Sequence, residues 1–109
     1  MSPAAGDPRF RALLDELWAL HRSKGGDYGT KGDNFANYHR AIRLGVRPSL
    51  SVMLRMAEKV SRLESMVATG RTPNHESVQD NLRDIAAQAL IALILLAEEA
   101  EQGDFGEAA

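Results

Sequence analysis

The sequence contains no cysteine, which excludes structural disulfides and thiolate metal sites. Aromatic residues make up only 6% of the chain, and the formal net charge is only −2. Such a small charge argues against broad electrostatic binding of nucleic acid, so any anionic ligand is expected to be small. The absence of cysteine also fits a reducing compartment, and we expect a cytoplasmic protein.

A long hydrophobic segment is missing as well. The longest apolar run, residues 85–97, is too short to span a bilayer, and acidic residues flank it. Residues 1–7 lack the basic and apolar regions of a signal peptide. The 109 residues suffice for one small domain with a limited core. We therefore expect a single domain over residues 1–109, with flexible tails at 1–7 and 103–109 and no membrane partner.

What the sequence does contain is helical periodicity. Asp7 and Pro8 have the character of an N-cap and a first helical turn, and apolar residues then recur at helical spacing to about Ser23. The Gly25–Gly26 pair is expected to end this helix. Residues 24–34 are accordingly predicted to form a glycine-rich loop.

Two further helices are predicted in the middle of the chain. A short one covers residues 35–44, and a long one covers residues 50–69, with Ser49 or Ser51 as its cap. The apolar stripe of the long helix consists of Val52, Met56, Val60, Leu63 and Val67. Lys59 borders this stripe, and the opposite face is polar.

The last helix carries acidic residues at its start and apolar residues afterwards. Asn74 is expected to cap it, and it should continue to about Gln102. At about 100° per residue, its first half separates into two faces. These are an acidic face of Glu76, Asp80 and Asp84 and an apolar face of Val78, Leu82 and Ile85.

The second half of that helix is apolar in nearly every direction, as in a helix buried on all sides. The residues concerned are Ile91 and Leu93 to Leu96. A small chain can hardly cover such a segment, so we expect an all-α bundle of three long or medium helices and one short helix, completed as a homodimer or larger homo-oligomer. The alternative is that the first and second long helices cover the segment alone.

Four acids converge if the last two helices pack antiparallel, as their short connection suggests. They are Glu58, Glu76, Asp80 and Asp84. Oxygen ligands without cysteine or a histidine pair favour Mg²⁺, with Mn²⁺ as a second choice. Cations on the adjoining face suit phosphate groups: Arg55, Lys59 and Arg62. The alternative is a solvated acidic face with ordinary surface ion pairs.

Four short motifs follow one another along residues 24–93. They are Lys24-x-x-Asp27-Tyr28-Gly29, Asp33-Asn34-Phe35, Glu58-Lys59-x-x-Arg62-Leu63 and Glu76-Ser77-x-x-Asp80-x-x-x-Asp84. Together they resemble small phage and bacterial proteins of the all-α nucleotide pyrophosphohydrolase group, and more narrowly MazG-like domains associated with nucleotide modification. The resemblance implies a helical oligomer that binds Mg²⁺ and hydrolyses a nucleoside triphosphate or related nucleotide, releasing pyrophosphate.

The resemblance also implies roles for individual residues. Metal ligands would be Glu58, Glu76, Asp80 and Asp84, with Glu58 or Asp80 as the catalytic base. The phosphates would contact Lys59 and Arg62, and the nucleotide pocket would be shaped by Lys24, Asp27, Tyr28 and Asn34. Tyr28 would stack on a base or, alternatively, close the loop over the bundle.

The chain also departs from the pattern of the active enzymes. The Glu-Glu-x-x-Glu run of the earlier helix is absent around Glu58, and the later acids are four apart instead of in a Glu-x-x-Asp pattern. Gln88 stands where related phage proteins tend to carry tyrosine. A second function is therefore a non-catalytic nucleotide-binding oligomer, such as a phage sequestration or regulatory protein. A purely structural helical oligomer is the third.

Overall fold

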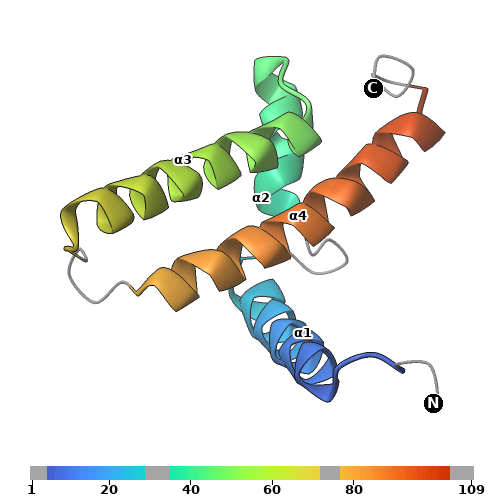
Figure 1. Ribbon diagram of the computed structural model, residues 1–109. Coiled ribbons are helices and arrows are strands. Elements are labelled where there is room, and N and C mark those ends of the chain that lie inside the picture. The colour runs from blue at the N-terminus through green and yellow to red at the C-terminus, as the bar shows by residue number, and fades with distance from the viewer. Residues whose placement is uncertain (1–4, 29–34, 72–76, 104–109) are drawn as a thin grey trace. The chain divides into compact units, whose positions relative to one another are not determined.

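A computed structural model describes residues 5–28, 35–71 and 77–103 of the chain (Figure 1). These residues form helices and connecting segments, and no strand occurs among them, so the predicted all-α class is confirmed. Contacts divide the chain into two units, Met1–Ala36 and Asn37–Ala109. No helix in the described ranges is long and apolar enough to cross a membrane.

The first unit contains α1, Pro8–Tyr28. It begins where the sequence predicts, because Asp7 Oδ1 accepts the backbone N–H of Arg9 at 2.8 Å and so caps the helix. The prediction that Gly25 and Gly26 end the helix is wrong, since α1 continues through both to Tyr28. Each glycine costs a helix about 1 kcal/mol relative to alanine, which weakens a helix without terminating it.

The second unit begins within a short helical segment, which was predicted for residues 35–44. It consists of α2, Ala36–His39, followed by the 3₁₀ helix η1, Arg40–Leu44. Gly45 ends it with φ of 74°, and its N–H donates to the carbonyl of Ile42 at 2.9 Å. This left-handed conformation favours glycine because a Cβ atom would be strained there. The chain then turns directly into the next helix.

That helix, α3, spans Pro48–Thr69 and ends at Gly70 as predicted. Its start was not predicted correctly. Arg47 is the N-cap and makes no side-chain capping bond, while Pro48 occupies the first turn. Proline suits this position because its ring fixes φ and it has no N–H to leave unsatisfied. Ser49 is fully buried instead of capping the helix.

The last helix, α4, spans Val78–Glu101, so it ends about where the sequence predicts. Its N-cap is Ser77, whose Oγ accepts the backbone N–H of Asp80 at 3.0 Å. The predicted cap, Asn74, lies outside the described residues. The serine cap fixes the start of the helix and places Asp80 in its first turn, where a carboxylate is favoured by the helix dipole.

Helices α3 and α4 lie side by side and antiparallel, and together they form a hairpin (Figure 1). The inward positions of both helices alternate in steps of three and four residues, the spacing of helices that pack knobs into holes. We call this set the seam, and every member is buried or half-buried: Ser49, Val52, Met56, Lys59, Leu63 and Met66 on α3 with Asn81, Ile85, Gln88, Ala92, Leu95 and Glu99 on α4.

The residues of the seam differ from the predicted apolar stripes of the two helices. Val60, Val67 and Leu82 were expected to face inward, but they are 42%, 77% and 52% exposed. Lys59 and Met66 take the inward positions on α3. Met66 and Val67 are both apolar, so hydrophobicity alone does not predict which of these two neighbours faces inward. The helical pattern puts Lys59 only at the border of the stripe, whereas in the structure it is half-buried with Asp84 as its partner, and a charged residue is rarely buried without one.

Candidate functional site

An ion pair joins the two helices in the middle of the seam. Lys59 Nζ lies 3.0 Å from Asp84 Oδ2, and the two side chains are only 23% and 26% exposed. These residues belong to the two motifs that were predicted to meet, one on α3 and one on α4. The antiparallel packing of the hairpin therefore does bring the Lys59 and Asp84 parts of those motifs together.

The other predicted metal ligands are less enclosed. Asp80 is 63% exposed and lies 3.8 Å from Arg83 Nη1, and Glu58 is exposed on α3. Glu76 lies outside the described residues. Among residues 5–28, 35–71 and 77–103, no group of three His, Asp or Glu side chains is placed to hold a metal ion. These predicted ligands match the oxygen donors that Mg²⁺ prefers, but of those that the structure describes only Asp84 is half-buried, against the seam residue Lys59.

The predicted phosphate-binding cations lie along α3. Arg55 and Arg62 are exposed, and Lys59 between them is half-buried. The guanidinium carbon of Arg55 lies 5.6 Å from the centre of the Tyr38 ring, within the range of a cation–π contact. Tyr38 was not identified from the sequence, because this contact depends on how α2 folds back against α3.

The predicted nucleotide-pocket residues belong to the first unit or its end. The backbone of Lys24, Asp27 and Tyr28 is the last part of α1, not a loop as expected. Their side chains, and all of Asn34, lie outside what the structure describes. Their proposed contacts with a nucleotide stay a prediction.

Sequence reasoning missed a buried polar contact at one end of the seam. Glu99 is 4% exposed and Ser49 is fully buried. The Ser49 hydroxyl donates to Glu99 Oε1 at 2.7 Å, and the Ser49 backbone N–H donates to Oε2 at 3.0 Å. Next to this contact, His39 Nε2 lies 3.0 Å from Glu98 Oε1. The sequence feature that could have revealed this contact is the alternating spacing of three and four residues, which places both Ser49 and Glu99 at inward positions.

Two buried side-chain oxygens of α4 have no hydrogen-bond partner, Asn81 Oδ1 and Gln88 Oε1. Asn81 is 1% exposed, and its Nδ2 donates to the Ser77 carbonyl at 2.9 Å, which fixes the orientation of the amide. Leaving a buried acceptor unpaired costs about 1–3 kcal/mol. Along α4, one of these unpaired acceptors thus comes before Asp84 in the sequence and the other comes after it.

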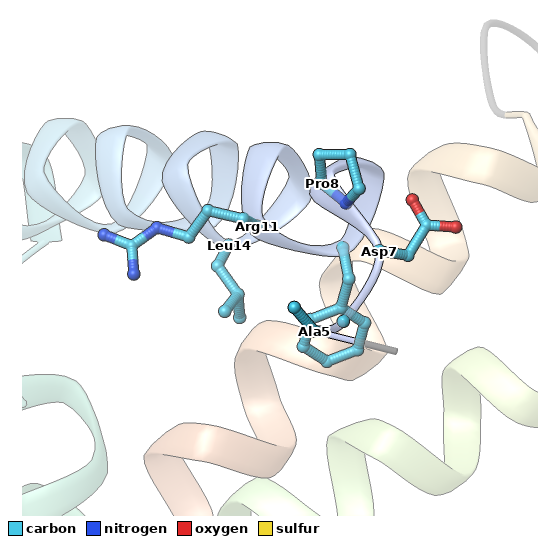
Figure 2. A pocket seen from close by; sticks show the side chains of 7 residues that line it. Ala5, Asp7, Pro8, Arg11 and Leu14 are labelled. Carbon is cyan, nitrogen blue, oxygen red and sulfur yellow. The ribbon is translucent and has the colours of Figure 1, made fainter. Parts of the chain in front are cut away.

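A separate surface hollow of about 580 Å³ lies at the start of α1 (Figure 2). It is lined mainly by apolar groups around the helix cap, including Ala5, Phe10 and Leu14. The Arg9 guanidinium donates to the Asp7 carboxylate beside it and holds the pKa of Asp7 below its usual value. None of the predicted site residues lines this hollow.

Comparison of the chain with protein families, with characterised proteins and with solved structures found no match. The resemblance to MazG-like proteins is therefore carried by the four short motifs alone.

Proposed function

We propose that the chain is a nucleotide-processing protein of the MazG-like type, a Mg²⁺-dependent pyrophosphohydrolase whose site lies on the α3–α4 hairpin. The observation that supports this proposal is the Lys59–Asp84 pair. It puts the acid-Lys-x-x-Arg motif of α3 beside the acidic motif of α4, as a site built from both motifs requires.

In this proposal the chain's residues have three tasks. Arg55, Lys59 and Arg62 bind the phosphates, and an exposed carboxylate, Glu58 or Asp80, takes a proton from the attacking water. The water oxygen forms a bond to the α-phosphorus, the bond from that phosphorus to the bridging oxygen breaks, and pyrophosphate leaves. Magnesium, held by acids from the set Glu58, Glu76, Asp80 and Asp84, would supply neutralisation of the phosphate charge.

The second candidate is a non-catalytic nucleotide-binding protein. It is favoured by the pairing of Asp84 with Lys59 and by the lack of a three-acid group in the described part of the chain. In that case Lys59 and the arginines of α3 would still hold phosphate, and Asp84 would orient Lys59.

A homo-oligomer is part of both candidates. The outward face of α4 supports it, because large apolar side chains there stay uncovered in the hairpin. Leu90, Leu93 and Ile94 are 47%, 64% and 45% exposed. Burying such side chains against another helix would stabilise an assembly, by up to about 1.5–3 kcal/mol for each fully buried one.

The test is to incubate the pure protein with Mg²⁺ and a panel of nucleoside triphosphates while following pyrophosphate, with binding of a non-hydrolysable triphosphate measured in parallel. We expect Asp84→Asn and Asp80→Asn each to lower pyrophosphate release about a hundredfold or more. Glu64→Gln is the matched control, since Glu64 is an exposed acid of α3 outside both motifs. It should leave the rate unchanged.

The two candidates give different results. Binding without any pyrophosphate from any triphosphate would contradict the enzyme and support the second candidate. If the triphosphate does not bind at all, both proposals fail and a structural helical protein remains.

A further inference from the structure

The pairing between the two helices can be read from contacts at both ends of the seam. In two antiparallel helices, the sequence numbers of two residues that face each other always have about the same sum. That sum is 148 for Ser49 and Glu99 and 147 for Met66 and Asn81. Lys59 therefore faces Gln88 or its neighbour Ala89, and not Asp84, which is one turn further toward the start of α4.

Lys59 thus reaches along the seam to its present partner. An ammonium group carries three N–H donors on a flexible four-carbon stem, and the contact with Asp84 Oδ2 at 3.0 Å uses one of them. Gln88, which faces Lys59 across the seam, has a buried side-chain oxygen without a hydrogen-bond partner. Asp84 and Gln88 are four residues apart on α4, so they are neighbours on one helix face, roughly 6 Å apart.

We infer that the Lys59 ammonium has two positions in the seam: one on the Asp84 carboxylate and a second on the side-chain oxygen of Gln88. After the move to Gln88 the ammonium no longer neutralises the Asp84 carboxylate, which favours a divalent cation there, and in this respect the inference rests on the proposed function. Gln88 is then a positioning residue, which acts on the site through Lys59.

Electrostatics gives the direction of the move. The carboxylate is the stronger partner for an ammonium group, so Lys59 stays on Asp84 while no other cation is near. A divalent ion on Asp84 repels the ammonium, which is half-buried and costly to leave without a partner. The unpaired oxygen of Gln88 lowers that cost, because it accepts a hydrogen bond from the displaced ammonium.

The first experiment needs no metal ion and uses the full chain. Gln88→Leu removes the second position with little change in volume, and Asp84→Ala removes the first. Gln88→Leu alone should keep or raise the melting temperature, since it deletes an unpaired acceptor. Asp84→Ala should lower the melting temperature by about 5 °C more in the Gln88→Leu background than in the native chain, because Lys59 then has neither partner.

The matched control is Asn81→Leu, which removes the other unpaired side-chain oxygen of the seam, at the position that faces Met66. Its effect and that of Asp84→Ala should add. If the Gln88→Leu and Asp84→Ala effects are also additive, or if Asn81→Leu gives the same non-additivity, the two-position inference is overturned.

The second experiment measures Mn²⁺ binding by calorimetry. Gln88→Leu should weaken it about tenfold, the equivalent of one lost hydrogen bond of about 1.4 kcal/mol. The same substitution should have no effect in a Lys59→Met background. Non-additive melting temperatures without any Mn²⁺ binding would uphold the two positions of Lys59 and contradict the metal site of the proposed function. Mn²⁺ binding that Gln88→Leu does not change would uphold the metal site and overturn the inference.

Discussion

Removal of the Glu99 carboxylate should destabilise the hairpin more than any change on its exposed surface. In Glu99→Ala, both the hydroxyl and the N–H of Ser49 lose their acceptor, and Ser49 is fully buried. Each orphaned donor costs about 1–3 kcal/mol. Because water can enter the space left near the end of the hairpin, we expect the lower part of the summed range, about 2–3 kcal/mol.

Glu99→Gln should destabilise the hairpin less than Glu99→Ala, because it keeps the shape of the side chain and removes only its charge. The glutamine oxygen can accept the Ser49 N–H, and its NH₂ group can donate to the hydroxyl oxygen. Only the additional strength of a charged acceptor is lost, about 1 kcal/mol. Ser49→Ala, which deletes the hydroxyl and keeps the N–H contact, should couple strongly to Glu99→Ala in a double-mutant cycle.

Urea unfolding followed by circular dichroism at the helix band measures these effects. Glu101→Ala is the control, because it makes the same change in the same final turn at an exposed position. It should stay within about 0.5 kcal/mol of the native chain. A Glu99→Ala variant as stable as this control would refute the view that the carboxylate holds the hairpin ends together.

Two other predictions concern the remaining surfaces. The Arg9 guanidinium lowers the pKa of Asp7, so the capping contribution of Asp7 is complete above its unfolded-state pKa and is lost as the pH falls through the lower folded-state pKa. Arg9→Gln should raise that pKa in a carboxyl NMR titration; an unchanged value would mean that the backbone N–H alone sets it. Ile94→Asp, on the outward face of α4, should dissociate the expected assembly while preserving helicity. An unchanged mass by light scattering would contradict the role of that face.

The sequence was most informative where one local signal dominates. The end of α3 at Gly70 follows from the left-handed conformation that glycine adopts there, with φ of 66°. The start of α1 follows from the Asp7 side chain, which finds its partner within two residues. The apolar content of the last helix predicts that its second half is buried on all sides, whereas in the hairpin Leu93 and Ile94 are 64% and 45% exposed.

The errors have a different origin, since they depend on partners far away in the sequence. Ser49 looks like a helix cap until Glu99, fifty residues later, takes up its hydroxyl. Lys59 looks like a surface residue until Asp84 is placed against it. The local propensity of the Gly25–Gly26 pair indicates a break, but the helix already formed on its N-terminal side continues through both residues, because helix extension is cooperative. For the candidate site, the motifs predicted that the acidic face of α4 lies against the cationic face of α3, but they gave no sign that Lys59 pairs with Asp84 or that Tyr38 is involved.

The polar residues of the seam also decide whether α4 can slide along α3. A shift by two helical turns would keep the step pattern, yet it would set Ser49 against Ala92 and carry Glu99 past the start of α3, so the buried hydroxyl and N–H of Ser49 would lose their acceptor. Sliding of one helix past the other would therefore cost the free energy of two unpaired buried donors, which opposes sliding as a way for this hairpin to pass a signal. An engineered hairpin with leucine at those polar positions would gain stability and lose the single alignment, as in helix pairs whose polar seam residue specifies the pairing.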